Sequence, residues 1–134
     1  EWVNASYTNN PKEPQKLIHK TIPGILVRSK SEALIINALF EHKIPFRYEC
    51  LLQIQNVSIY PDFTIRHPVT GEVYYWEHFG MMDNEDYYNA VLRKLDAFEM
   101  NQLLIGRDVL LLHESSSAPL NTRVLDCYIQ EYLV

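Results

Sequence analysis

Two acidic residues, Asp62 and Glu77, stand in stretches of the chain that are otherwise typical of half-buried β-strands. Residues 57–66 (VSIYPDFTIR) and 72–79 (EVYYWEHF) are rich in β-branched and aromatic residues, and the HPVTG between them predicts a hairpin turn. If the turn spans residues 68–71, Asp62 lies directly opposite Glu77 on the neighbouring strand. Facing residues of such a pair have Cβ atoms roughly 4.5–5.5 Å apart. The sequence therefore predicts two carboxylates side by side on a sheet.

Two adjacent carboxylates repel each other unless a shared proton, a basic neighbour or a divalent cation compensates their charge. Mg²⁺ and Mn²⁺ prefer oxygen ligands, and Mg²⁺ typically takes one or two carboxylates together with water and phosphate oxygens. The pair therefore predicts a site for Mg²⁺ or Mn²⁺. The alternative is that one of the two acids points to solvent at the end of its strand.

The apolar pattern of the chain predicts the elements that position this pair. Their order is helix, three strands, helix, strand, helix, over residues 29–43, 44–54, 57–66, 72–79, 83–101, 108–115 and 123–134. Ser29 and Glu32 match a capping box at the start of the first helix. A meander of three strands followed by a helix that crosses to a fourth implies a central mixed four-stranded sheet flanked by helices. The expected fold class is α/β.

The quoted segments resemble a known family. YPDF with Asp62, YWEH with Glu77 and a preceding helix that bears Glu32 are similar to the PD-(D/E)XK nuclease superfamily. The resemblance covers roughly residues 26–115, and RSKSE, YPDFTI and YWEHFG blocks occur similarly in bacterial and phage-type members. It implies a restriction-endonuclease-like αβββαβ core with Glu32, Asp62 and Glu77 as catalytic metal ligands for Mg²⁺ or Mn²⁺. For Glu32, capping alone is the alternative role.

The resemblance fails at one position. The family's lysine is expected two residues after Glu77, where this chain has Phe79. Some members take the basic residue from the following helix, and Lys94 is then the candidate catalytic residue, because it shares a helix face with Val91 and Phe98. The resemblance implies that Lys94 orients or helps deprotonate the attacking water. The alternative is a lysine that only flanks an apolar stripe.

Charge is distributed unevenly along the chain. Residues 1–31 carry five basic and two acidic side chains, a net charge of +3, whereas residues 32–134 carry seven and fifteen, a net charge of −8. The overall charge of −5 argues against a protein that coats nucleic acid. The basic segment predicts phosphate contacts through three of its side chains, or else a solvated arm; the three are Lys20, Arg28 and Lys30.

The implied function is a divalent-metal-dependent nuclease that hydrolyses phosphodiester bonds in DNA, with RNA left open as a substrate. Its sequence specificity is expected to be low, because no helix-turn-helix or zinc module is visible. A homodimer and a larger nucleic-acid-processing complex remain open as assemblies. The first alternative is a catalytically degenerate domain of the same fold that binds nucleic acid or a protein. The second is an α/β interaction module without a nucleic-acid role.

The expected organisation is an extended basic N-terminal arm over residues 1–25 and a single nuclease-like domain over residues 26–134. No run of 18 apolar residues is present, so no membrane contact is expected. The first residues lack a signal-peptide pattern, and Cys50 and Cys127 match no metal or redox spacing. Both cysteines are expected as buried free thiols, with a disulfide between them as the alternative, and the protein is expected in the cytoplasm.

Overall fold

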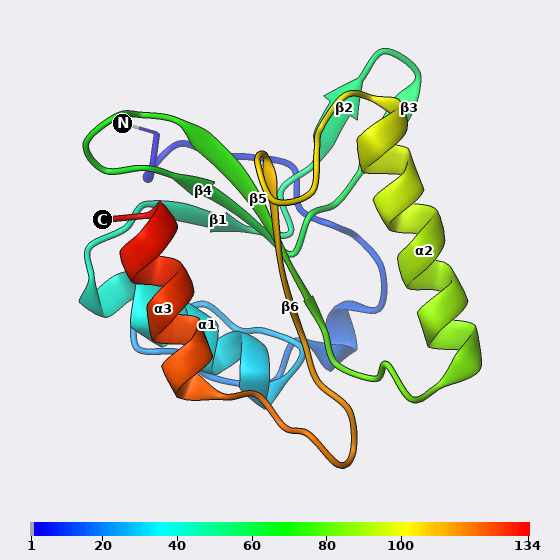
Figure 1. Ribbon diagram of the computed structural model, residues 1–134. Coiled ribbons are helices and arrows are strands. Elements are labelled where there is room, and N and C mark those ends of the chain that lie inside the picture. The colour runs from blue at the N-terminus through cyan, green and yellow to red at the C-terminus, as the bar shows by residue number, and fades with distance from the viewer. Residues whose placement is uncertain (1) are drawn as a thin grey trace.

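A mixed four-stranded sheet lies at the centre of the protein in the computed structural model, which describes residues 2–134 (Figure 1). The strands are β1 (Phe46–Tyr48), β2 (Leu52–Ile54), β3 (Val57–Ile59), β4 (Phe63–Arg66), β5 (Val73–Phe79) and β6 (Val109–His113). The helices are η1 (Pro14–Lys16), α1 (Lys30–Glu41), α2 (Glu85–Met100) and α3 (Thr122–Tyr132). Among the described residues, no helix has the length and apolar character needed to cross a membrane.

The central sheet has the strand order β1-β4-β5-β6. Strand β4 is antiparallel to both of its neighbours, β1 and β5, and β6 runs parallel to β5 after the crossover through α2. The prediction of an α/β fold with a mixed four-stranded sheet flanked by helices is thereby confirmed.

The predicted strands over residues 44–54 and 57–66 are each divided in the structure. Strands β2 and β3, which come between β1 and β4 in the chain, form a separate two-stranded sheet that the sequence did not predict. Gln55 has a left-handed backbone, with φ 52°, in the tight turn that joins β2 to β3. Pro61 then separates β3 from β4, because proline cannot donate a hydrogen bond to a sheet ladder.

The helices cover the sheet on both faces. Helices α1 and α3 lie on one face, and α2 with the β2–β3 hairpin lies on the other (Figure 1). Side chains alternate along β5, so Trp76 is buried against α1 and α3 while Tyr75 packs toward Phe98 of α2. The same alternation places Glu77 on the face covered by α2.

The predicted hairpin register is confirmed. Phe63 pairs with Trp76, and Arg66 pairs with Val73. At the turn, the backbone N–H of His67 donates to the carbonyl of Glu72 at 2.8 Å, as expected for a turn over residues 68–71. Extending this register by one residue sets Asp62 opposite Glu77.

The N-terminal segment lies against the rest of the molecule. Asn9 forms an isolated antiparallel bridge with Cys50, directly after β1. The guanidinium of Arg47 in β1 lies 4.2 Å from the centre of the Trp2 ring and 5.3 Å from that of Tyr7. Cation–π contacts of this kind hold residues 2–9 to the sheet edge. The boundary between arm and domain at residue 25 stays a prediction.

Both cysteines are free thiols. Cys50 is buried, as predicted, but Cys127 is exposed, so the prediction was wrong for Cys127. The buried positions of α3 are Leu125 and Ile129. Cys127 lies two residues from each of them and therefore on the opposite side of the helix.

Candidate active site

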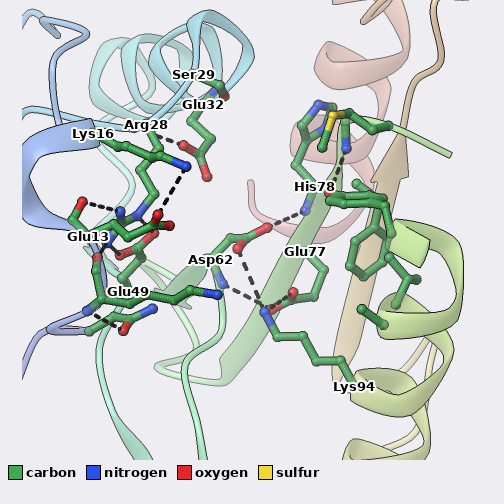
Figure 2. A pocket seen from close by; sticks show the side chains of 18 residues that line it. Glu13, Lys16, Arg28, Ser29, Glu32, Glu49, Asp62, Glu77, His78 and Lys94 are labelled. Atoms are coloured by element: carbon green, nitrogen blue, oxygen red, sulfur yellow. Dashed lines mark hydrogen bonds and ion pairs between the residues drawn. The ribbon is translucent and has the colours of Figure 1, made fainter. Parts of the chain in front are cut away.

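Asp62, directly before β4, and Glu77 on β5 are linked through each other's strands (Figure 2). The backbone N–H of Asp62 donates to Oε2 of Glu77 at 2.9 Å. The backbone N–H of His78 donates to Oδ2 of Asp62 at 2.8 Å. Each carboxylate thus accepts a backbone donor from the other strand. One oxygen of each, Oδ1 of Asp62 and Oε1 of Glu77, takes no part in these bonds.

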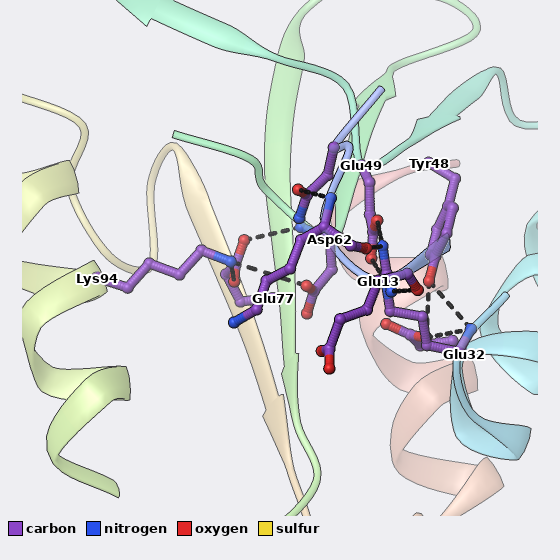
Figure 3. A network of polar contacts seen from close by, with 10 residues as sticks. Glu13, Glu32, Tyr48, Glu49, Asp62, Glu77 and Lys94 are labelled. Atoms are coloured by element: carbon purple, nitrogen blue, oxygen red, sulfur yellow. Dashed lines mark hydrogen bonds and ion pairs between the residues drawn. The ribbon is translucent and has the colours of Figure 1, made fainter. Parts of the chain in front are cut away.

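Lys94 reaches these two carboxylates from α2 (Figure 3). Its Nζ lies 2.5 Å from Oε1 of Glu77 and 3.8 Å from Oδ1 of Asp62. Val91 and Phe98 are buried on the same helix face, so the helix packs on the sheet with Lys94 directed to the pair. The structure therefore brings together three of the four predicted catalytic residues.

Burial dominates the electrostatics of this group. The side chain of Glu77 is 0 % exposed, and burial, reinforced by the charge of Asp62, raises its pKa, while the ammonium of Lys94 opposes the shift. Burial disfavours the charged form of Lys94, but Asp62 and Glu77 outweigh it and raise the pKa of Lys94 above its ordinary value. Lys94 is therefore a cation and a hydrogen-bond donor at neutral pH.

Glu32, the fourth predicted catalytic residue, lies in the first turn of α1. Its backbone N–H donates to Oγ of Ser29 at 3.1 Å, which confirms Ser29 as the N-cap. Its Oε1 accepts hydrogen bonds from the hydroxyl of Tyr48 at 2.9 Å and from the backbone N–H of Arg28 at 3.1 Å. In a capping box the carboxylate of Glu32 would accept a hydrogen bond from the backbone N–H of Ser29. Here it accepts one from Arg28, the preceding residue, and Tyr48 fixes its position.

The environment of Glu32 favours its neutral form. Burial raises the pKa of Glu32 to about 7, and the nearby charges of Asp62 and Glu49 act in the same direction. Hydrogen bonds from Tyr48 and Arg28 offset part of this effect. Glu32 consequently changes its charge near neutral pH.

The predicted phosphate ligand Arg28 is engaged by the chain itself. Its Nε and Nη2 contact Glu49 at 2.8 and 3.1 Å, in a bidentate ion pair. Its Nη1 donates to the carbonyl of Glu13 at 2.9 Å, and Nη2 donates to the carbonyl of Lys12 at 2.5 Å. A phosphate contact from Arg28 stays a prediction. It requires that the phosphate replace one of the present hydrogen-bond partners of the guanidinium.

The other predicted phosphate ligands, Lys20 and Lys30, are exposed and do not line the cavity that holds the acids. Lys12 and Lys16 line it instead. The cavity has a volume of about 550 Å³, and five acidic and four basic side chains contribute to its wall (Figure 2). They are Glu13, Glu32, Glu49, Asp62, Glu77, Lys12, Lys16, Arg28 and Lys94.

A second polar cluster anchors α1 to the end of β5, and sequence reasoning missed it. Glu114 Oε1 accepts a hydrogen bond from the Ser31 hydroxyl at 2.7 Å, and its Oε2 accepts one from the backbone N–H of Leu120 at 2.5 Å. Nε2 of the buried His78 ring lies 3.5 Å from Oε1 of the same carboxylate. Glu114 thereby connects His78, which follows Glu77, to Ser31, which precedes Glu32. These residues are distant in sequence, so no local pattern signals the cluster.

The donor set fits a divalent cation at two carboxylates. Oε1 of Glu77 is buried, and apart from the ammonium of Lys94 it has no hydrogen-bond donor among the described residues. Mg²⁺ typically takes one or two carboxylates, with water and phosphate oxygens as its remaining ligands. Within residues 2–134, no group of three or more His, Cys, Asp and Glu side chains is placed to hold a metal ion. Asp62 and Glu77 therefore fit as ligands, while direct ligation by Glu32 stays a prediction.

Comparisons of the chain with protein-family models, with curated proteins and with solved structures found no match. The chemical capacity of the site follows from its own groups. Two fixed carboxylates and one ammonium share a sheet face, beside a third acid that titrates near neutral pH. Such a group can bind a cation through its oxygens and an anion through its ammonium.

Proposed function

We propose that the protein is a divalent-metal-dependent nuclease of the PD-(D/E)XK type, which hydrolyses phosphodiester bonds in DNA with low sequence specificity. The observation that carries the proposal is the position of Lys94. Its ammonium lies 2.5 Å from Glu77 and 3.8 Å from Asp62, although it comes from α2 and not from the strand position occupied by Phe79. A basic group beside two carboxylates is what the proposed chemistry requires, whichever element supplies it.

The order of elements supports a restriction-endonuclease-like core. Helix α1 precedes the antiparallel meander β1-β4-β5, and α2 then leads to the parallel strand β6. This is the order αβββαβ, with the β2–β3 hairpin as an insertion between the first and second strands of the core. Glu32 on α1, Asp62 before β4 and Glu77 on β5 occupy the elements that carry the acids in the PD-(D/E)XK family.

In the proposed reaction, Asp62 and Glu77 would hold Mg²⁺ or Mn²⁺, which would supply a bound water of lowered pKa and offset charge on the phosphate. Lys94 remains protonated, so it donates hydrogen bonds to the attacking water or to a phosphate oxygen and stabilises the negative charge of the transition state. Glu32 would contribute as an additional ligand or through a water-mediated contact, in either case by its Oε2, because Tyr48 and the Arg28 backbone already occupy its Oε1.

One observation favours the alternative, a catalytically degenerate domain of the same fold that binds nucleic acid or a protein. The ammonium of Lys94 already compensates the buried carboxylate of Glu77 without a metal ion. A Glu77 carboxylate whose charge Lys94 already compensates is compatible with a site that no longer binds a metal ion or cleaves a phosphodiester. The two functions differ in whether a divalent cation binds at Asp62.

Thermal unfolding in Mg²⁺ or Mn²⁺ distinguishes them. We expect the cation to raise the melting temperature of the wild-type protein, with a stabilisation of about 2.7 kcal/mol at a metal concentration 100 times Kd. Asp62→Asn should abolish the shift, because it removes a ligand charge. Asp126→Asn, an exposed aspartate on α3, is the matched control and should keep it. Equal shifts in the two variants, or no shift together with no cleavage of DNA, would contradict the nuclease proposal.

A further inference from the structure

Residues 10–16, here called the strap, run along one side of the acidic cavity. Arg28 anchors the strap by donating to the backbone carbonyls of Lys12 and Glu13. The same guanidinium forms the ion pair with Glu49, whose side chain is only 9 % exposed. Because this pair is largely withdrawn from solvent and bidentate, the strap has a fixed position on the rim.

The backbone of the strap turns sharply at Glu13. Its φ of 45° and ψ of 60° lie in the left-handed region, which costs a residue with a side chain roughly 1–2 kcal/mol. The carbonyl bond from Arg28 holds Glu13 in this conformation. Lys12 precedes the turn and Lys16 follows it, and both side chains line the cavity. Figure 2 shows Lys16 on the side of Asp62 and Glu77 opposite to Lys94.

The two lysines are available to an anionic ligand. Among residues 2–134, no acidic side chain forms an ion pair with Lys12. Lys16 pairs with Glu13 at 3.2 Å, but these side chains are 61 % and 42 % exposed. An ion pair that exposed is worth at most about 1 kcal/mol, so a phosphate can displace it. The cavity therefore has a buried acidic end at Asp62 and Glu77, and an exposed basic rim formed by Lys12 and Lys16.

We propose that Lys12 and Lys16 bind the backbone phosphates of a single-stranded nucleic acid and hold it against Asp62 and Glu77. The assignment of a substrate strand rests on the proposed nuclease function, and the phosphate contact rests on the strap. A flexible single strand can follow the strap into the cavity, which has a volume of about 550 Å³ and is lined by residues of the strap and of α2. Backbone-tracking basic side chains are the usual means by which proteins bind single strands.

Fluorescence anisotropy with labelled oligothymidylate tests the rim. The protein carries Asp62→Asn in every sample, so the oligonucleotide is not cut. Lys12→Ala and Lys16→Ala should each weaken binding and lower the slope of log K against log salt by about 0.7, the value for one phosphate contact on a single strand. Lys43→Ala and Arg123→Ala remove the same charge from exposed positions outside the cavity and should leave the slope unchanged.

A hairpin duplex of the same labelled length tests the form of the nucleic acid. We expect it to bind more weakly than oligothymidylate at each salt concentration. Duplex binding as tight as single-strand binding would overturn the choice of substrate. Unchanged slopes in the Lys12 and Lys16 variants, or no binding of either nucleic acid, would overturn the rim itself.

The rim and the nuclease proposal fail separately. Binding that depends on Lys12 and Lys16 without any metal-induced thermal shift supports the rim and contradicts the nuclease. DNA cleavage in Mg²⁺, together with oligothymidylate binding that is unchanged in the Lys12→Ala and Lys16→Ala variants, supports the nuclease and overturns the rim.

Discussion

Among residues 2–134, Lys94 is the one cation that contacts the buried carboxylate of Glu77. The Glu77 side chain is 0 % exposed, and the ammonium of Lys94 lies 2.5 Å from its Oε1. A buried carboxylate that loses its cationic partner is strongly destabilising, whereas neutral side chains of similar shape at both positions are often tolerated. Stability in the absence of metal therefore reports on this contact.

Lys94→Met should lower the free energy of unfolding by about 3–5 kcal/mol in EDTA, because it leaves the charge of Glu77 buried and unpaired. Urea titration measures the change. Arg93→Met alters the exposed neighbouring residue of α2 and should change stability by less than about 0.5 kcal/mol. The double variant Glu77→Gln with Lys94→Met should recover most of the loss. A double variant no more stable than Lys94→Met would contradict the pairing.

Glu32 should make stability depend on pH. Because burial raises its pKa from 4.5 to about 7, the folded state binds more protons than the unfolded chain between these values. The free energy of unfolding should therefore fall as the pH rises through this window, by about 3 kcal/mol from Glu32 alone. Glu32→Gln should remove this share, as measured by urea titrations in EDTA from pH 4 to pH 8. Parallel pH profiles for the two proteins would contradict the burial of this charge.

The side-chain positions that the sequence predicted and the structure confirms follow from patterns within one hairpin or one helix. A hairpin register places Asp62 against Glu77, and helical periodicity directs Lys94 to the sheet. Lys12 and Tyr48 were not predicted to be at the site, because their positions depend on contacts across the fold. Tyr48 reaches Glu32 from β1, and Lys12 reaches the cavity through the folded strap.

At the scale of elements, the start of α1 delivers its acid to the cavity. Ser29 caps the helix and also lines the cavity, and Ser31 ties the same turn to Glu114. Both the cap and Glu32 follow from the capping-box pattern in the sequence. The β2–β3 hairpin does not, since its turn forms around Gln55 in a left-handed conformation that glutamine seldom adopts.

Ser29→Ala and Asn121→Ala compare two N-caps, of which only the first borders the cavity. Each should cost about 1 kcal/mol of stability, as measured by urea titration. Only Ser29→Ala should reduce the metal-induced rise in melting temperature, because it loosens the turn that carries Glu32. An equal reduction in both variants would show that the helix start has no special connection to the site.

At the scale of the whole molecule, the basic first segment lies against an acidic body. Residues 1–31 have a net charge of +3 and residues 32–134 a net charge of −8. Charge patterning predicted this asymmetry, whereas the return of the segment to the cavity through Arg28 and Arg47 depends on tertiary contacts. Through these contacts, Trp2, Lys12 and Glu13 lie against the rest of the molecule.

Limited trypsin digestion measures how firmly the segment is held. The wild-type protein should be cut slowly after Lys12 and Lys16, because Arg28 fixes the strap. Arg28→Ala should accelerate these cuts, while Arg66→Ala, an exposed arginine of β4, should not. Fast cleavage of the wild-type strap would contradict the anchored conformation.

Cleavage of labelled single-stranded DNA in Mg²⁺ by the wild-type protein, Lys94→Ala and Arg93→Ala is the decisive experiment. The wild-type protein and Arg93→Ala should cut at similar rates, and Lys94→Ala should be slower by about 10²–10⁴-fold, the usual effect of losing a positioned acid–base or charge-stabilising group. A wild-type protein that leaves the DNA intact, or a Lys94→Ala variant that cuts at the wild-type rate, would contradict a nuclease whose basic residue is Lys94.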